Sequence, residues 1–149
     1  MELSPGELLE YEDRSENKSL YNNKHKETDI TILQWNVERN YEADGIIEEI
    51  KRLSPDVCIL QEIDIDCERS GNRNHMEELC KSLNMKGVFV CEFLELYSSL
   101  RKSRDQGGGF HGNAILSKYD FNVQVIDHKY QPFQWDKDGH LLNEPRKGK

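Results

Sequence analysis

The sequence predicts an α/β domain built on one sheet, and three observations carry this prediction. Residues 29–37 and residues 56–63 are apolar and rich in β-branched side chains, which is typical of buried strands. Between them, residues 41–55 place apolar side chains at helical spacing. Because so short a strand–helix–strand unit makes a right-handed crossover, the two strands should be parallel.

The individual elements follow from local patterns along the first half of the chain. "DITILQWNV" is the first expected strand, and "DVCILQEI" is a continuous apolar run that fits a strand buried on both faces. The helix between them ends at Pro55, which cannot continue a helix. Its apolar residues lie three or four positions apart on one face, at Ile46, Ile47, Ile50 and Leu53.

Further elements are expected in the second half. Residues 75–84 have helical spacing, and residues 86–96 form an apolar segment typical of a strand. Between that segment and the next apolar run lies a polar loop, residues 98–109, which is long enough to indicate a functional role. "NAILS" and "FNVQVID" are expected to pair as strands around a tight turn, with a loop-like terminal stretch after them.

Composition limits the class of protein. The chain has 149 residues, enough for one domain, and is polar, with 36% hydrophobic and 32% charged residues. Its net charge of −8 argues against a dedicated nucleic-acid coat. No apolar run is long enough for a transmembrane segment, and the N-terminus lacks a secretory pattern. The expected location is therefore intracellular, in the cytoplasm or nucleus.

The cysteines and the N-terminal residues complete this division of the chain. The 4 cysteines form no CxxC pair, so they predict buried, reduced thiols and no zinc site. Residues 1–28 are rich in polar side chains and predict a poorly ordered extension with at most one helical turn. Residues 29–149 are then the domain itself.

Polar residues end the two parallel strands that the sequence predicts. Asn36 closes the first strand and Glu62 closes the second. Neighbouring strands lie about 4.8 Å apart, so both side chains could reach one point at the carboxyl edge of the sheet. A carboxylate and an amide oxygen suit Mg²⁺ or Mn²⁺. The alternative is that both strands simply end in polar residues where they meet water.

The glycine-rich stretch "QGGGFHGNAILS", residues 106–117, is not a phosphate loop of the nucleotide-binding kind. Such a loop opens a helix, whereas here a strand follows and no GK[ST] is present. The glycines are instead expected to permit a positive φ or a close backbone approach beside a site. His111, considered alone, is more typical of a surface or capping residue than of a catalyst.

Taken in order, "ILQWNVERN", "PDVCILQEID" and "GFHGNAILSKYDF" resemble the endonuclease/exonuclease/phosphatase superfamily of metal-dependent phosphoesterases. The resemblance runs from about Thr31 to the end of the sequence. It implies a DNase I-like four-layer α/β sandwich and a Mg²⁺- or Mn²⁺-dependent hydrolysis of a phosphoester. It implies that Glu62 is the principal metal-binding carboxylate and that Asn36 lies by the metal and the scissile phosphate. It places His111 and Asn113 toward the phosphate.

The resemblance is incomplete. The family's second half supplies an Asp-x-Asn pair and a late Asp-His, and this sequence contains neither in the expected setting. We therefore expect an incomplete, N-terminal part of such a domain, active in a full-length parent and inactive as an isolated chain. A sheet lacking its partner sheet should leave side chains such as Ile59 and Leu116 partly exposed.

Two alternatives remain at this point. One is a non-catalytic remnant or binding module that keeps the half-sheet. The other, a flavodoxin-like protein, should have a phosphate loop after its first strand, where this chain has "ERNYEAD". The sequence does not distinguish nucleic acid, nucleotide and phospholipid head group as substrates, and it indicates no specific protein partner.

Overall fold

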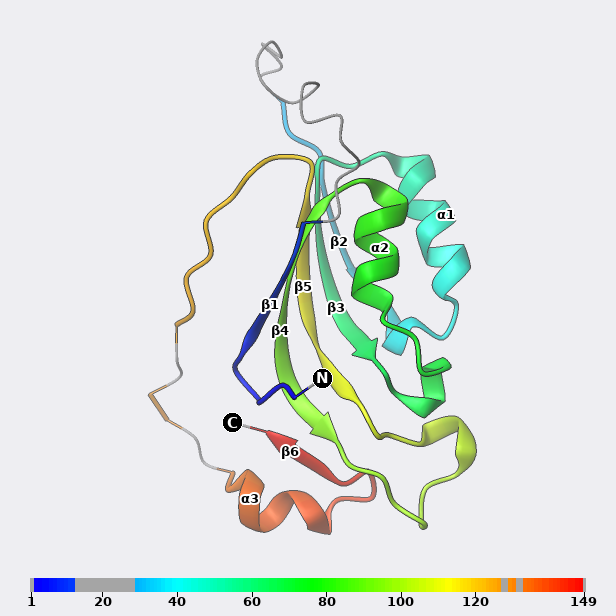
Figure 1. Ribbon diagram of the computed structural model, residues 1–149, viewed down its shortest axis with the longest axis vertical. Helices are drawn as coiled ribbons and strands as arrows, with labels where there is room; N and C mark the ends of the chain where they lie inside the picture. Colours follow the sequence, from blue (N-terminus) through cyan, green and yellow to red (C-terminus); the bar gives the residue numbers. More distant parts are fainter. Residues whose placement is uncertain (1, 13–28, 127–128, 131–132, 149) are drawn as a thin grey trace.

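A computed structural model describes residues 2–12, 29–126, 129–130 and 133–148. Its centre is a mixed sheet with two helices on one face (Figure 1). The described strands lie side by side in the order β1-β4-β5-β3-β2. Strand β6 also pairs with β4, beyond the part of β4 that pairs with β1. The strands are β1 (Leu8–Tyr11), β2 (Ile32–Asn36), β3 (Val57–Ile65), β4 (Lys86–Glu95), β5 (Phe110–Ser117) and β6 (Arg146–Gly148). The helices are α1 (Ala43–Leu53), α2 (His75–Leu83) and the short α3 (Trp135–Asp138).

The predicted strand–helix–strand unit is confirmed. Strands β2 and β3 are parallel neighbours, with Ile32 opposite Val57 and Asn36 opposite Gln61. Helix α1 connects them. Ser54 caps its C-terminal end in a left-handed conformation with φ 50°. Every other strand pair in the described sheet is antiparallel. The predicted α/β class is therefore confirmed, and the mixed sheet is consistent with a DNase I-like arrangement.

The main core lies between the sheet and the helices α1 and α2. Alternate residues of β3 and β5, such as Leu60 and Leu116, point to this side and are fully buried. Burying a side chain of this size removes enough apolar surface to stabilise the fold by about 1.5–3 kcal/mol. The helices supply the opposing side chains, which are Ile46, Ile50, Met76, Leu79 and Cys80.

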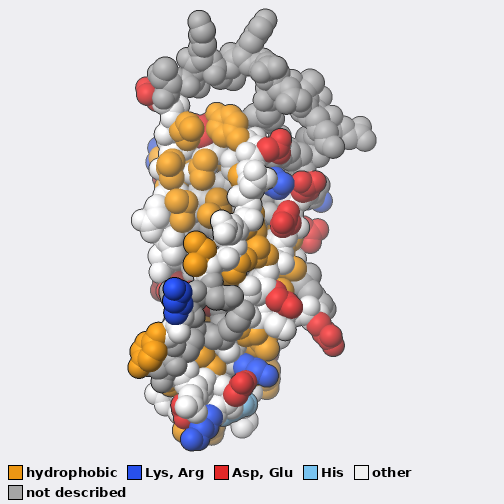
Figure 2. Space-filling view, turned by 90° about the vertical axis from the view of Figure 1, so that its left-hand side faces the viewer, with side chains coloured by type: hydrophobic (Ala, Val, Ile, Leu, Met, Phe, Trp, Pro, Cys, Tyr) orange, Lys and Arg blue, Asp and Glu red, His pale blue; other side chains and the backbone are white. Residues whose placement is uncertain are grey.

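The opposite face of the sheet is open and partly apolar. Ile59 is 36% exposed, as expected, and Ile115 is 42% exposed. The expectation for Leu116 is wrong, because this residue alternates to the helix side and is 0% exposed. Figure 2 shows apolar side chains gathered over the upper part of the molecule. Residues 123–126 run along this face and line a groove of 370 Å³ with side chains of β1, β3, β4 and β5.

Three segments differ from the sequence-based expectations. Residues 8–11, placed in the polar extension with at most a helical turn, form strand β1 against β4, because Leu9 and Tyr11 pack on the helix-side core. Residues 121–126 form no strand, since β5 already has β3 and β4 on its two edges. The terminal stretch expected to be a loop contains α3 and β6. Residues 13–28 and 127 lie outside the described residues.

The backbone of the glycine-rich loop requires glycine at two positions. Gly108 has φ +94°, and a Cβ on Gly109 would lie 2.2 Å from the Ile65 carbonyl oxygen. The expected positive φ and close approach are thus both present. The loop is also anchored: the Gln106 and Gly107 carbonyls accept hydrogen bonds from Arg69 N and Glu68 N at 3.0 Å. It therefore joins the segment around residues 67–71 to the sheet.

The open face predicts self-association of the 149-residue chain. Replacing Ile115 by lysine should reduce this association, because it puts a charge in the centre of the exposed apolar surface. Sedimentation velocity over a concentration series measures the effect. Leu100→Lys is the control, since Leu100 is 91% exposed on the loop after β4 and does not line the groove. Equal association of the two variants would contradict the prediction.

Candidate functional site

A β-bulge sets the direction of Glu62. Leu60 pairs with Ala114 and Ile63 pairs with Gly112, so two residues, Gln61 and Glu62, lie opposite Asn113 alone. Glu62 takes a left-handed conformation with φ 60°. Such a bulge re-aims side chains, and here it brings both polar residues to the open face instead of the core.

The structure brings Asn36 and Glu62 into contact, but β3 continues to Ile65, so the expectation that Glu62 closes its strand is wrong, and Glu62 lies in the bulge. Asn36 Nδ2 donates a hydrogen bond to Glu62 Oε1 at 3.0 Å. Asn36 Oδ1 in turn accepts from the backbone N–H of Glu38, also at 3.0 Å. The amide of Asn36 is therefore oriented at both ends, with its nitrogen toward the carboxylate.

A left-handed turn follows Asn36. The residues Glu38, Arg39 and Asn40 have φ values of 48°, 61° and 57°, which residues other than glycine rarely adopt. Each such residue costs on the order of 1 kcal/mol or more, so surrounding contacts must hold the turn. One of them is the buried Asn40 side chain, whose Oδ1 accepts from the Asp64 backbone N–H at 3.3 Å. The turn is thereby tied to the residues that follow Glu62.

The donor set at this edge fits a hard divalent cation that keeps most of its water. Within the described residues there is no cluster of three or more His, Cys, Asp or Glu side chains that would enclose a metal. Glu62 is half-buried and presents a carboxylate beside an exposed amide. Mg²⁺ is usually held by one or two carboxylates together with waters and substrate phosphates, so an open set of this kind is compatible with it.

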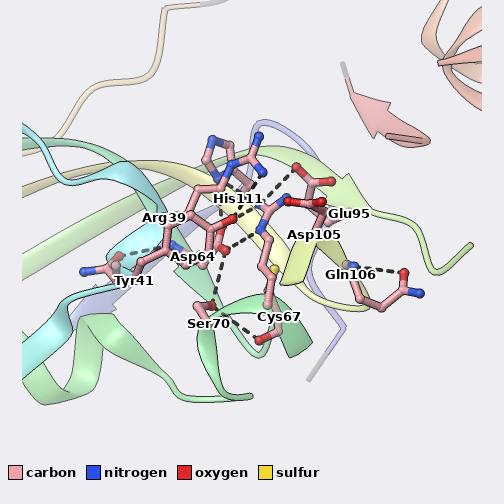
Figure 3. A network of polar contacts seen from close by, with 12 residues as sticks. Arg39, Tyr41, Asp64, Cys67, Ser70, Glu95, Asp105, Gln106 and His111 are labelled. Atoms are coloured by element: carbon pink, nitrogen blue, oxygen red, sulfur yellow. Dashed lines mark hydrogen bonds and ion pairs between the residues drawn. The ribbon is translucent and has the colours of Figure 1, made fainter. Parts of the chain in front are cut away.

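His111 lies in a charged network and not on the surface as an isolated residue (Figure 3). Its Nδ1 is 2.8 Å from Asp64 Oδ1, and its ring stacks on Phe93 with centroids 6.1 Å apart. Arg69 donates to both oxygens of Asp64, at 2.7 and 2.8 Å. Ser70 Oγ donates to the same carboxylate at 3.2 Å. Asp64 is fully buried, so these donors replace its lost water.

Glu95 extends this network to the end of the chain. Its two carboxylate oxygens accept from Arg69 Nη2 at 3.2 Å and from Arg101 Nη2 at 2.9 Å. Arg146 of β6 adds an ion pair with Nε 2.8 Å from Glu95 Oε1. Sequence reasoning missed Arg69, Arg101 and Glu95, because they lie on separate segments and form no spaced motif. The only available signal was the "CERSG" loop beside Asp64.

Asn113 occupies a different part of the same face. It is half-buried on β5, opposite the bulge and two residues from His111, and it lines the groove on the open face. The structure thus places Asn36 and Glu62 in direct contact and Asp64 with His111, while Asn113 lies on the strand beside the bulge.

Acid is expected to destabilise the chain in two steps. Burial lowers the pKa of His75 below 6.5, so stability falls as the unfolded chain takes up that proton below about pH 6.5. Burial raises the pKa of Asp64, but hydrogen bonds from Arg69 and His111 outweigh it, and the net pKa lies below 3.8. A carboxyl with a depressed pKa stabilises the fold above its unfolded pKa, so a second loss follows below about pH 4.

Urea unfolding at a series of pH values measures both steps. The Asp64→Asn variant should be less stable at neutral pH and should lose the lower step, because the titrating group is gone. Retention of the full lower step in that variant would assign it to other carboxyls.

Comparison with known proteins adds the last observation. None of the described helices is long and apolar enough to cross a membrane. Searches of curated proteins and of solved structures gave no significant match. The model of the Endonuclease/Exonuclease/phosphatase family matches residues 33–148. This range includes β2 from its second residue, the bulge of β3, the His111 network and β6. The chain therefore belongs to the endonuclease/exonuclease/phosphatase family.

Proposed function

We propose that the protein hydrolyses a phosphoester with the help of a Mg²⁺ or Mn²⁺ ion held by Glu62. The observation that carries the proposal is the 3.0 Å contact between Asn36 Nδ2 and Glu62 Oε1, where the parallel pairing of β2 with β3 ends. Family membership supports the general class of reaction. The half-buried Glu62 and the exposed Asn36 leave this edge accessible to a substrate.

Each residue has a distinct proposed role. A divalent ion at Glu62 would act as a Lewis acid on a phosphoryl oxygen. Asn36 orients the Glu62 carboxylate and offers its amide to a phosphate or water. Asp64 accepts a hydrogen bond from Nδ1 of His111, so Nε2 of that ring would donate to a phosphate oxygen in the doubly protonated form of the ring. Asn113 supplies a further amide on the same strand.

The substrate class stays open within phosphoesters: a nucleic acid, a nucleotide or a phospholipid head group. The net charge of −8 disfavours long nucleic acids, which need a basic surface. The 4 cysteines are all buried and form no disulfide bond with one another, which supports the proposal of a reducing, intracellular setting.

A non-catalytic binding module is the second candidate. It is favoured by the sequence, which lacks the family's Asp-x-Asn and late Asp-His motifs that prepare the attacking water. A positioned general base typically contributes about 10²–10⁴-fold to the rate. For the same reason we propose that the 149-residue chain by itself binds the ion without turning over a phosphodiester.

Hydrolysis of bis(p-nitrophenyl) phosphate by the product of the natural reading frame tests the proposal. We expect activity with Mn²⁺, none with EDTA, loss in Glu62→Gln and retention in Glu48→Gln. Glu48 is an exposed residue of α1, so its replacement removes the same charge elsewhere. Metal-independent hydrolysis, or full activity of Glu62→Gln, would reject the proposed role. Absence of hydrolysis together with retained Mn²⁺ binding would favour the binding module.

A further inference from the structure

The carboxylate of Glu144 lies among three arginines from three separate segments. Its Oε2 is 2.8 Å from Arg146 Nη2, 3.0 Å from Arg39 Nη2 and 3.9 Å from Arg69 Nη1. We call Arg39, Arg69 and Arg146 the three-arginine site. One carboxylate oxygen thus faces three guanidinium groups, which is an arrangement that proteins use for phosphate as well as for carboxylate.

Arg69 is held so that one edge of its guanidinium remains available. Its Nε and Nη2 are engaged by Asp64 and Glu95, and its side chain is 0% exposed. The third nitrogen, Nη1, is buried and has no hydrogen-bond partner. An unpaired, buried N–H group of a cation is costly, typically by more than about 1–3 kcal/mol. Glu144 Oε2 lies 3.9 Å from Nη1, which is too far to satisfy it.

The other two arginines also have contacts besides the one with Glu144. Arg146 has its Nε 2.8 Å from Glu95 Oε1, and its guanidinium carbon lies 5.2 Å from the centre of the Phe93 ring. Arg39 belongs to the left-handed turn after Asn36, with φ 61°, and its Nη1 donates to Tyr41 Oη at 3.5 Å. The site is therefore formed by the fold and does not depend on Glu144 alone for its geometry.

The charges of the network require an anion at this position. The guanidinium groups of Arg39, Arg69, Arg101 and Arg146 face the carboxylates of Asp64, Glu95 and Glu144. Asp64 and Glu95 are fully buried and engaged by other donors, so Glu144 is the member that another anion can replace. Its side chain is 33% exposed.

The segment around Glu144 allows such a replacement. The neighbouring Pro145 carbonyl accepts from Leu96 N at 3.0 Å and from Arg101 Nη2 at 2.7 Å, so the backbone is anchored. Glu144 itself lies in neither helix nor strand. Its side chain can therefore turn to solvent without unpairing β6.

We infer that the three-arginine site binds a phosphate group of the substrate and that Glu144 occupies it when no substrate is bound. The ligand assignment rests on the proposed function. Arg39 lies in the turn that follows Asn36, and Arg69 pairs with Asp64, which follows Glu62 on β3. The site therefore takes a phosphate beyond the one at the metal. Glu144 acts as a competing internal anion that a substrate phosphate displaces. Substrates carrying a phosphate group next to the scissile one are accordingly preferred.

Calorimetric titration with inorganic phosphate, in EDTA and at constant ionic strength, tests the inference in the 149-residue chain. We expect Glu144→Gln to bind phosphate about tenfold more tightly than the wild type, because the competing charge is removed. Glu144→Asp, which keeps the charge on a shorter side chain, should lie between them. The matched control is Glu49→Gln, which breaks a Glu–Arg pair with a single arginine on α1. It should bind phosphate as the wild type does.

A second change identifies the binding groups. Adding Arg39→Gln to Glu144→Gln should return phosphate affinity to the wild-type level or below. Phosphate should also raise the melting temperature of Glu144→Gln more than that of the wild type, whereas chloride should not. Equal affinity of wild type, Glu144→Gln and Glu49→Gln would overturn the inference, as would tight binding that survives Arg39→Gln. These measurements contain no metal, so their failure is distinct from failure of the proposed metal role at Glu62.

Discussion

The Glu62→Gln substitution is expected to weaken Mn²⁺ binding to the 149-residue chain by about 100-fold or more. Glu62 is the carboxylate that the bulge directs to the open face, whereas Asn36 contributes only a dipole. Glutamine keeps the size of the side chain and can still accept a hydrogen bond from Asn36. The loss is therefore electrostatic and not a consequence of repacking. Electron paramagnetic resonance of free Mn²⁺ during a titration measures it.

Two further variants define what this result means. Glu48→Gln should leave Mn²⁺ affinity unchanged, because Glu48 is exposed on α1 and far from the strand ends in the sequence. Asn36→Ala should weaken binding less than Glu62→Gln, since it removes an orienting contact and no charge. Equal affinities of wild type and Glu62→Gln would remove Glu62 from the metal site.

Replacing Arg69 by alanine is expected to lower the free energy of unfolding by about 3–5 kcal/mol. The side chains of Arg69, Asp64 and Glu95 are each 0% exposed, so the substitution leaves two buried carboxylates without their shared cation. For a domain of this size, such a loss is a large part of the total stability. Urea unfolding followed by circular dichroism gives the value.

An exposed arginine supplies the comparison for this effect. Arg52 pairs with Glu49 on the surface of α1 and its side chain is 67% exposed. Arg52→Ala should therefore change stability by no more than about 0.5 kcal/mol. If Arg69→Ala changed stability as little as Arg52→Ala, water would have to enter the network and solvate Asp64 and Glu95. The stability of the protein would then not depend on the ion pairs of this network.

The same network explains how distant loops are held beside the candidate site. Arg69 comes from the segment after β3, Arg101 from the long polar loop and Arg146 from β6, and all three meet at Glu95. His111 is attached to this assembly through Asp64. We therefore expect variants of Arg69 to affect both folding and the position of His111, and assays of such variants must be read alongside their stability.

Local patterns in the sequence were sufficient for the α/β class and for the core of the candidate site. Apolar spacing and Pro55 delimit α1, and a short crossover forces β2 and β3 to be parallel. Once the strands are parallel, Asn36 and Glu62 lie near one edge of the sheet, which is the part of their placement that could be predicted. Their direct contact also needs the bulge, which turns Glu62 to the face that Asn36 occupies.

Long-range pairing decided the remainder. Strict alternation along "VCILQEIDI" would place Glu62 and Asp64 on the helix side with Cys58 and Leu60. The register of β3 against β5 inserts the bulge, which reverses the faces, so that Ile63 and Ile65 enter the core. The shift of buried apolar positions from 58 and 60 to 63 and 65 was the available signal, but the apolar Ile59 obscured it.

The strands β1 and β6 and the charged network were beyond local reasoning for a related reason. β1 and β6 are segments of 4 and 3 residues, too short for an alternating pattern to identify them, and they form strands by pairing with β4. Likewise, Arg69, Glu95 and Glu144 carry no periodicity that links them, and each alone is indistinguishable from a solvated surface charge. The sequence by itself determined α1, α2 and the parallel strands that bear Asn36 and Glu62. Only the tertiary structure decided which charges are buried together, because burial depends on contacts between residues far apart in the chain.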